Sequence, residues 1–217
     1  MNKQIYHTLR NRIIFLEYAP GHILKEQVLA EEFGVSRTPL RTVLFRLEWE
    51  HLVKILPRTG IQVSELELNT ITHVFQARLE LESVIGTMAA ERFTRSHFTR
   101  LDQLTVRCRH LLEHHDPEGL GRLDMDLKQL FHDAAGNPFL MEMSDRFYVL
   151  TFRLWYFNLV KMDNHGLAKE AMCLQTDLGA LTKVLGEGPP EAVGKDRKDQ
   201  LLEHIQRIRS TFLGFTI

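Results

Sequence analysis

The stretch of residues 34–60 constrains the fold most, because it combines a turn, a capped helix and a hairpin. Gly34 tolerates a left-handed conformation, and Ser36 is a residue type that commonly caps a helix. Apolar residues then recur at helical spacing: Leu40, Val43, Leu44 and Leu47. The pairs Val53, Ile55 and Ile61, Val63 flank Pro57-Arg58-Thr59-Gly60. This last pattern predicts two short strands joined by a turn.

Two further helices are predicted before this stretch. Ile5, Leu9, Ile13 and Leu16 repeat at helical spacing, and the pattern ends before Ala19-Pro20-Gly21. Val28, Leu29 and Phe33 mark a short second helix that Gly34 closes. Helix, helix, helix and hairpin is the order of a winged helix-turn-helix. We therefore predict such a DNA-binding domain over residues 1–64.

The charge distribution supports this division. The whole chain carries a formal net charge of −1 at pH 7. Residues 1–64 nevertheless hold nine Lys and Arg against six Asp and Glu, and the remaining residues hold 18 against 22. This asymmetry favours a small basic module attached to a larger acidic one.

The third predicted helix carries the candidate DNA-reading residues. Helical geometry places Arg37, Thr38 and Arg41 off its buried face, with the two arginines one turn apart. An arginine matches the O6 and N7 acceptors of guanine with two donors. The helix start, at Ser36 and Thr38, favours a phosphate. The alternative is that Arg37 and Arg41 only solvate a surface helix and pair with Glu48 or Glu50.

The hairpin tip adds a second candidate contact. Arg58, Thr59 and Gly60 form the predicted turn, from which a basic side chain can reach the DNA backbone or the minor groove.

Residues 64–67 form the predicted linker, and a second, all-helical domain is predicted over residues 68–217. Asp116-Pro117 and Asn137-Pro138 each place a capping residue before a proline, which is a helix start signal. Residues 186–194 are rich in glycine and proline and predict a flexible loop. With no run of 18 apolar residues, no cleavable signal and only two cysteines, we expect a cytoplasmic protein without membrane contact.

Residues 5–63 resemble the GntR family of bacterial transcription regulators, in its FadR-like branch with an FCD domain. The matching residues are Pro20-Gly21-His22-Ile23-Leu24, the run from Leu29 through Arg41, and Leu47-Glu48 through Gly60. The resemblance implies that Ser36, Arg37, Thr38 and Arg41 contact the operator and that Gly60 lies at the wing tip. Two residues depart from the family pattern, since Thr42 stands where Glu is usual and His51 where Gly is usual.

The remainder resembles the FCD domain. The matching segments are Arg78 through Glu82, Ala89 through Arg92, Phe131-His132 through Asn137, and His204-Ile205. The resemblance implies an all-helical antiparallel bundle around an effector pocket, often with a divalent metal held by one Asp and three His. The implied ligand positions here carry Lys128, His132, Asp177 and His204.

Two interpretations of these four residues remain open. A protonated lysine has no lone pair to donate to a metal, but His132, Asp177 and His204 could still hold zinc or nickel with three ligands. Alternatively, Lys128 replaces the cation and pairs with Asp177 or with a carboxylate effector. Arg78 is a further candidate for effector binding, and its alternative is an ion pair with Glu82 one turn away.

The sequence thus predicts a mainly α protein that regulates transcription in response to a ligand. We expect a homodimer that binds a pseudo-palindromic double-stranded operator as a repressor and responds to a small carboxylate. We expect no enzyme activity, because there is no phosphate loop, activated nucleophile or His-Glu-x-x-His motif. The alternatives are a zinc-dependent hydrolase with a DNA-binding head, and a DNA-binding module whose helical domain only dimerises.

Overall fold

The computed structural model describes residues 2–213, which divide into two compact units. The first contains the residues up to Thr72 together with Val149–Leu154, and the second contains the rest. The predicted fold class is confirmed, since a winged helix-turn-helix precedes an all-helical domain. The last four residues of the predicted range 68–217 lie outside the described residues.

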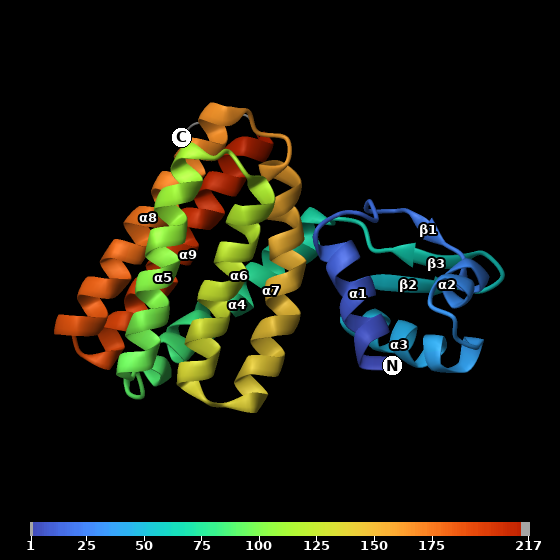
Figure 1. Ribbon diagram of the computed structural model, residues 1–217, viewed down its shortest axis with the longest axis horizontal. Helices are drawn as coiled ribbons and strands as arrows, with labels where there is room; N and C mark the ends of the chain where they lie inside the picture. Colours follow the sequence, from blue (N-terminus) through green and yellow to red (C-terminus); the bar gives the residue numbers. More distant parts are fainter. Residues whose placement is uncertain (1, 214–217) are drawn as a thin grey trace. The chain divides into compact units, whose positions relative to one another are not determined.

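The first unit holds three helices and a small antiparallel sheet (Figure 1). Its elements are α1 (Asn2–Ile14), β1 (Ile23–Leu24), α2 (Glu26–Glu32), α3 (Arg37–Trp49), β2 (Val53–Leu56) and β3 (Gly60–Val63). The strand order is β1-β3-β2. The sequence did not indicate β1, because two residues are too short to show an alternating pattern; it is defined by its pairing with β3, Ile23 opposite Gln62 and Leu24 opposite Ile61.

The apolar face predicted for α3 is buried. Leu40, Val43, Leu44 and Leu47 are each no more than 3% exposed. Full burial of one such side chain stabilises a fold by roughly 1.5–3 kcal/mol. Packing on α1 and α2 therefore leaves the opposite side of α3, including both candidate arginines, exposed.

A buried carboxylate fixes the end of α3 to α1. Glu50 accepts hydrogen bonds from Tyr6 Oη at 2.6 Å, Arg10 Nε at 3.0 Å and Arg46 Nε at 3.3 Å. Burial, together with the hydrogen bond to Glu50, raises the pKa of Tyr6 above its ordinary value, so the phenol stays a donor. These bonds join two helices more than thirty residues apart and hold α3 in place.

Two helices of this unit end in the same motif with different residues. At the end of α2, Gly34 N–H bonds Glu31 O and Val35 N–H bonds Ala30 O. At the end of α3, His51 N–H bonds Glu48 O and Leu52 N–H bonds Leu47 O. The motif requires a left-handed residue, and the φ angles are +62° at Gly34 and 60° at His51. His51 therefore adopts a conformation that favours glycine.

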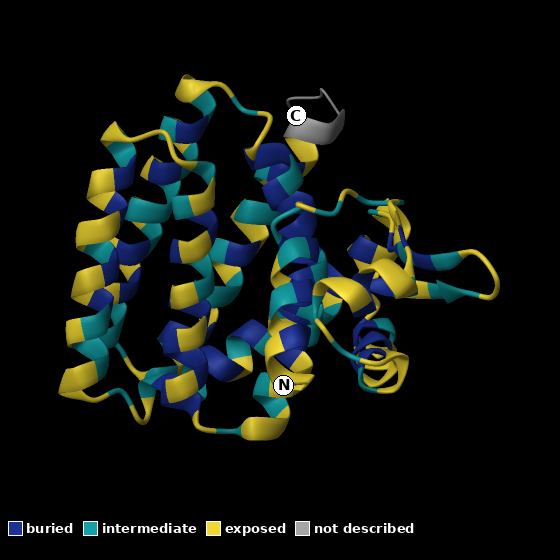
Figure 2. Ribbon diagram, turned by 45° about the vertical axis from the view of Figure 1, so that its right-hand side comes forward, coloured by how far each residue is buried: buried dark blue, intermediate teal, exposed yellow. Residues whose placement is uncertain are grey.

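Six longer helices contribute to the second unit. They are α4 (Leu68–Ala90), α5 (Arg95–Glu113), α6 (Pro117–Ala135), α7 (Pro138–Leu159), α8 (Asn164–Glu187) and α9 (Pro190–Leu213). Helix α5 packs against α6 and α8, and α8 packs against α9. Their buried faces point toward one another and their exposed faces point outward (Figure 2). None of the helices within residues 2–213 is long and apolar enough to cross a membrane.

The predicted start signals of α6 and α7 are confirmed, with a proline in the first turn of each helix. Asn137 caps α7 by accepting from Phe139 N–H and Leu140 N–H, both at 3.2 Å. Asp116 and Ser36 occupy the capping positions of α6 and α3 without a side-chain cap bond.

The prediction of a flexible loop over residues 186–194 is wrong. Helix α8 continues to Glu187 and α9 already begins at Pro190. A proline suits the first helical turn, where its missing N–H leaves no bond unmade. Gly194 lies inside α9, where a Cβ would overlap Ser83 O and Thr87 Oγ1 of α4. Because Gly194 has no side chain, α9 can cross α4 closely.

We predict that His51→Gly stabilises the winged unit by about 1 kcal/mol, because glycine removes the left-handed strain at the end of α3. Urea unfolding followed by circular dichroism measures the change. Gly34→Ala is the matched reverse change in the same motif, with no atom within 4 Å of the added Cβ. It should destabilise by a similar amount, and a neutral result for both variants would refute the argument.

We also predict that Gly194→Ala destabilises the helical unit by roughly 1–3 kcal/mol, because the added methyl group forces α4 and α9 apart. The control is Gly179→Ala in α8, where nothing lies within 4 Å of the new Cβ. Helix propensity should make that variant about 1 kcal/mol more stable. Equal effects of the two substitutions in urea unfolding would contradict the close crossing.

Candidate nucleic-acid interface and buried cavity

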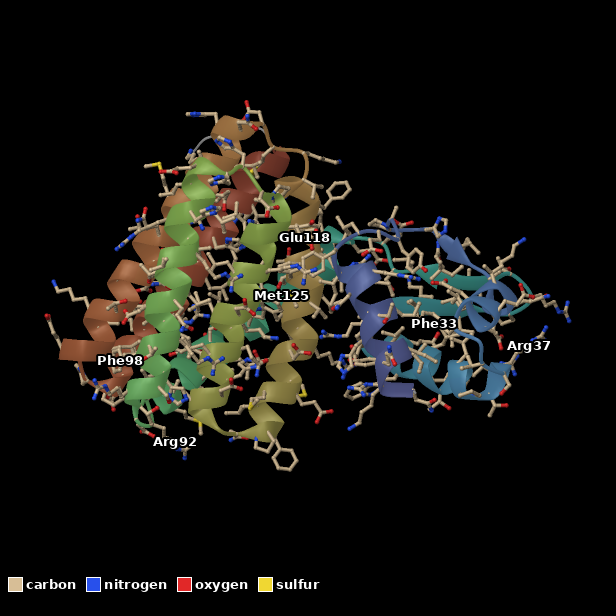
Figure 3. All side chains as sticks on the ribbon, in the orientation of Figure 1. Phe33, Arg37, Arg92, Phe98, Glu118 and Met125 are labelled. Atoms are coloured by element: carbon tan, nitrogen blue, oxygen red, sulfur yellow. The ribbon has the colours of Figure 1, made fainter. Side chains whose placement is uncertain are left out.

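The start of α3 presents a basic and polar surface. Ser36, Arg37, Thr38 and Arg41 are all exposed. The side chain of Arg37 extends outward from the winged unit (Figure 3), and it forms no ion pair with any residue from 2 to 213. The surface therefore has an unneutralised guanidinium beside the N-terminal N–H groups of a helix, which is an arrangement that attracts phosphate.

Arg41 has an acidic partner, but not one of those considered from the sequence. Its Nε lies 2.8 Å from Glu26 Oε1 and its Nη2 lies 3.3 Å from Glu26 Oε2, so α2 and α3 are joined by a two-point contact. Glu48 instead accepts from Ile55 N–H at 2.7 Å, and Glu50 belongs to the buried contact with α1. An exposed pair of this kind is worth only about 0–1 kcal/mol.

The contact with Glu26 uses one edge of the guanidinium. The edge formed by Nε and Nη2 faces Glu26, which leaves donors on Nη1 and Nη2 along the outer edge. A guanidinium can bind a second planar acceptor pair with that edge. Glu26 therefore orients Arg41 without occupying the donors that guanine would need.

The tip between β2 and β3 exposes Arg58 and Thr59. Arg58 has a φ of 66°, so the tip is a tight turn. Gly60 has a φ of +140°, and a Cβ there would lie 2.6 Å from Leu24 O. The structure thus gives Gly60 a packing role, because only glycine lets β3 pass this close to β1.

The second unit contains a cavity of about 70 Å³, lined by residues of α4, α6, α7, α8 and α9. Since one water molecule needs roughly 10–15 Å³ by the same measure, the cavity holds about five to seven water-sized groups. Its lining is strongly charged. The cations are Arg78, Arg197 and Arg207, and the carboxylates are Glu82, Asp124, Glu170 and Asp177.

Glu82 bridges two of the arginines. It accepts from Arg78 Nη2 at 2.8 Å and from Arg197 Nη2 at 2.7 Å. Burial alone would raise the pKa of Glu82, but the guanidinium groups of Arg197 and Arg78 outweigh it and hold the pKa at about 2. Glu82 is therefore ionised at neutral pH and ties α9 to α4.

The third arginine fixes the protonation of a histidine. Arg207 Nη2 donates to His204 Nδ1 at 3.3 Å, and Arg207 Nε lies 3.4 Å from Glu170 Oε1. Burial lowers the pKa of His204 to about 3, so the ring is neutral. Because Nδ1 is the acceptor, the proton lies on Nε2 and makes that nitrogen a donor.

The remaining two carboxylates differ in their partners. Asp124 accepts from Tyr148 Oη at 2.5 Å, and burial raises the pKa of both groups. Asp177 accepts no hydrogen bond with its carboxylate from the described part of the chain. Burial raises the pKa of Asp177 to about 6, because it outweighs the opposite effect of Arg207.

The structure brings together three of the five residues that the sequence indicated for effector binding. Arg78, Asp177 and His204 line the cavity. Arg78 also makes the ion pair with Glu82 that was its alternative interpretation. Lys128 and His132 lie outside the lining.

Both outlying residues have other neighbours. Lys128 pairs with Asp145 of α7, not with Asp177, and its Nζ lies 4.5 Å from the centre of the Tyr148 ring. His132 Nε2 lies 3.0 Å from Ser144 Oγ, and burial lowers the pKa of His132 to about 4. Tyr148 connects Lys128 to the cavity, because its hydroxyl binds Asp124.

Several cavity residues were missed from the sequence, although their spacing contained a signal. Asp124 precedes Lys128 by four residues and so shares its helix face. Arg197, His204 and Arg207 recur at spacings of seven and three, which also places them along one face of α9. The Arg197–Glu82 contact joins residues 115 positions apart, and no local pattern indicates such a pair.

The residues do not fit the metal site that the family resemblance implies. No group of three His, Cys, Asp or Glu that could hold a metal ion occurs within the described chain. His132, Asp177 and His204 are not gathered, and Lys128 brings a positive charge to the position of the expected Asp. A metal would have to bind His204 through Nε2, because Nδ1 accepts from Arg207. The ring proton would then move to Nδ1, where two N–H donors would face each other.

Comparisons with known proteins agree with this architecture. The HTH-type transcriptional repressor RspR of Escherichia coli (strain K12) is 29% identical over 135 residues, covering 62% of this chain and 59% of the relative. An HTH-type transcriptional regulator from an unstable DNA locus of Streptomyces ambofaciens is 34% identical over 144 residues, covering 65% of this chain and 56% of the relative. The chain thus spans less than two thirds of the length of these relatives.

A solved structure shares the fold. Escherichia coli McbR/YncC matches with a TM-score of 0.85 at 19% identity, covering 97% of this chain and 98% of that chain. Residues 1–63 match the model of the bacterial regulatory proteins of the gntR family, and residues 73–172 match the FCD domain. With a winged helix-turn-helix followed by a helical unit around a charged cavity, the chain belongs to the GntR family of bacterial regulatory proteins and carries an FCD domain.

Proposed function

We propose that the protein is a ligand-responsive DNA-binding transcription regulator that acts as a repressor. The single observation that carries the proposal is the start of α3, where Arg37 and Arg41 are exposed one turn apart on a helix whose other face is buried. A helix with that surface fits the major groove, and its arginines can read guanine. Ser36 and Thr38 would bind phosphate beside them, and Arg58 and Thr59 of the wing would add backbone contacts.

The acting species is a homodimer on a pseudo-palindromic operator. One copy offers one recognition helix, and two copies related by a two-fold axis place their helices about one turn of DNA apart. The ligand cavity lies in the other unit of each copy. A ligand changes operator affinity only if it binds one arrangement of the dimer more tightly than the other.

The ligand is a small organic acid that binds without a metal. Arg197 supports this, because its Nε is buried and has no hydrogen-bond partner within the described residues. A buried donor without a partner costs stability, and a bound carboxylate would satisfy it. The neutral His204 adds a second donor at Nε2.

Two other functions are less well supported. A zinc hydrolase needs metal ligands that converge on one open site, and the histidines expected to do so lie apart. A module whose helical domain only dimerises has no need of a charged cavity with unsatisfied polar groups. Titration with small acids separates a module that only dimerises from a regulator that responds to a small molecule.

We predict that Arg37→Ala and Arg41→Lys each weaken specific operator binding by about 5- to 150-fold, and that Arg41→Lys leaves binding to random DNA nearly unchanged because it keeps the charge. Lys retains the charge of Arg41 but cannot make the two-point contact with guanine. Fluorescence anisotropy at fixed salt measures both affinities, with an operator selected from random double-stranded DNA by the wild-type protein.

The control is Arg100→Ala, which removes a half-exposed arginine of α5 that pairs with Asp133. It should leave operator binding unchanged, because α5 belongs to the helical unit. Wild-type specificity in both α3 variants would exclude α3 as the reading helix.

We further predict that the protein purified without added metal keeps its melting temperature after dialysis against EDTA, and that zinc or nickel gives no saturable increase. Thermal unfolding with metal analysis by mass spectrometry provides the measurement. The physical reason is that Lys128 repels a cation and that His204 Nδ1 already accepts from Arg207. Stoichiometric metal whose removal lowers the melting temperature would overturn the metal-free interpretation.

A further inference from the structure

We propose that the cavity binds a small zwitterion, a molecule with both a carboxylate and an ammonium group, and that Asp177 receives the ammonium. This inference rests on the proposal that the cavity is the ligand site, and it names the chemical class of the ligand.

Asp177 is the starting point, because it differs from the other acidic residues of the cavity. Glu82 is held by two arginines, Glu170 lies near Arg207 and Trp155 Nε1, and Asp124 accepts from Tyr148. The carboxylate of Asp177 has no such donor in residues 2–213, and only its backbone oxygen accepts a bond, from Gln200 Nε2 at 3.1 Å. The Asp177 carboxylate is half-buried in the cavity lining, so it is an acceptor that a ligand in the cavity can reach.

The charge around Asp177 indicates which donor fits. The cavity lining carries three arginines and four carboxylates, with His204 neutral. A ligand with only a carboxylate would add negative charge to a lining that is already negative when all its acids are ionised. An ammonium group on the same ligand offsets that charge and pairs with Asp177.

The environment of Asp177 agrees with this geometry. Its pKa is raised to about 6, since burial disfavours the ionised form and the charges of Arg207 and Arg197 only partly compensate. Neither arginine lies close enough for an ion pair with it. A cation that arrives with the ligand would stabilise the ionised carboxylate, because opposite charges attract more strongly at a partly buried site than in bulk water.

The acid end of the ligand has donors elsewhere in the same lining. Arg197 Nε is buried and has no hydrogen-bond partner within the described residues, and its Nη2 is held by Glu82. His204 offers Nε2–H because Arg207 occupies Nδ1. The cavity therefore has donors for a carboxylate on α9 and an acceptor for an ammonium group on α8.

The size of the cavity limits the ligand further. About 70 Å³ holds roughly five to seven water-sized groups. Small amino acids such as alanine and serine are of this size, whereas nucleotides and fatty acids are far larger.

The test compares acids that differ only in the amino group. Isothermal titration calorimetry on the full-length wild-type protein uses three pairs: L-alanine with propionate, L-serine with 3-hydroxypropionate, and L-aspartate with succinate. In at least one pair we expect the amino acid to bind roughly tenfold or more tightly than its partner, the effect of one charge-assisted hydrogen bond. Equal binding within every pair, or no binding by any of the six, would overturn the proposal.

Asp177→Asn is the decisive variant. It should reduce the preference for the amino member to less than about threefold, because a neutral amide attracts ammonium weakly. The melting temperature of the ligand-free variant should stay the same or rise, since the lost carboxylate accepts no hydrogen bond in the described chain. A fall in melting temperature with an unchanged preference would give Asp177 a structural role and refute the inference.

Asp199→Asn provides the matched control, because Asp199 is an exposed carboxylate of α9 outside the cavity lining. This variant should retain the wild-type preference, and a loss in it would show a general charge effect and contradict the assignment to Asp177. Failure of the zwitterion preference leaves operator reading by Arg37 and Arg41 intact. Operator reading is tested separately, by the affinity of the α3 variants for DNA in the absence of any ligand.

Discussion

The buried carboxylate of Glu82 makes the contact on which the helical unit depends. It binds Arg78 of its own helix and Arg197 of α9, and these two arginines outweigh the cost of its burial. Breaking such a buried pair by removing one partner typically costs about 3–5 kcal/mol. The close crossing at Gly194, one turn before Arg197, lets α9 approach α4 far enough for the contact. The contact of Glu82 with Arg78 and Arg197 therefore positions α4 and α9, two of the helices that bring charged side chains to the cavity.

The winged unit uses two glutamates in different ways. Glu50 is 6% exposed and binds Tyr6, Arg10 and Arg46, so it fixes the end of α3 structurally. Glu26 makes an exposed contact with Arg41 that is weak and reversible. The contacts of Glu50 hold α3, and the contact of Glu26 orients the Arg41 side chain while its outer edge stays open. The proposed reading of a base by Arg41 requires both rigid support and an available donor edge.

Lys128 changes the chemistry at the position that the family resemblance assigns to a metal ligand, although it lies outside the cavity lining. The ammonium group of Lys128 in α6 supplies a positive charge there, and Asp145 of α7 neutralises it. His132 Nε2 contacts Ser144 Oγ, and Arg207 makes His204 a donor at Nε2. Under the proposed function, the charged lining would recognise its ligand by ion pairs and hydrogen bonds, and Asp177 would favour a ligand that carries a donor as well as a carboxylate.

Much of the fold followed from local patterns. The turn at Gly34, the buried face of α3 and the prolines that begin α6 and α7 are set by backbone geometry and helical spacing, which act over a few residues. The same locality explains the errors. The glycines and prolines of residues 186–194 look like a loop, whereas Pro190 starts a helix and Gly194 serves a crossing with a helix more than one hundred residues earlier.

The sequence by itself determined a winged helix-turn-helix with exposed arginines and a helical second domain, because periodicity and turn chemistry encode both. It also placed Lys128 and His132 on one face of a helix, since residues four apart share a side. Only the tertiary structure decided that Lys128 contacts Asp145 and His132 contacts Ser144, while Asp177, His204, Arg197 and Arg207 line one cavity. Which residues of distant helices become neighbours depends on how all the helices pack, and no local spacing contains that information.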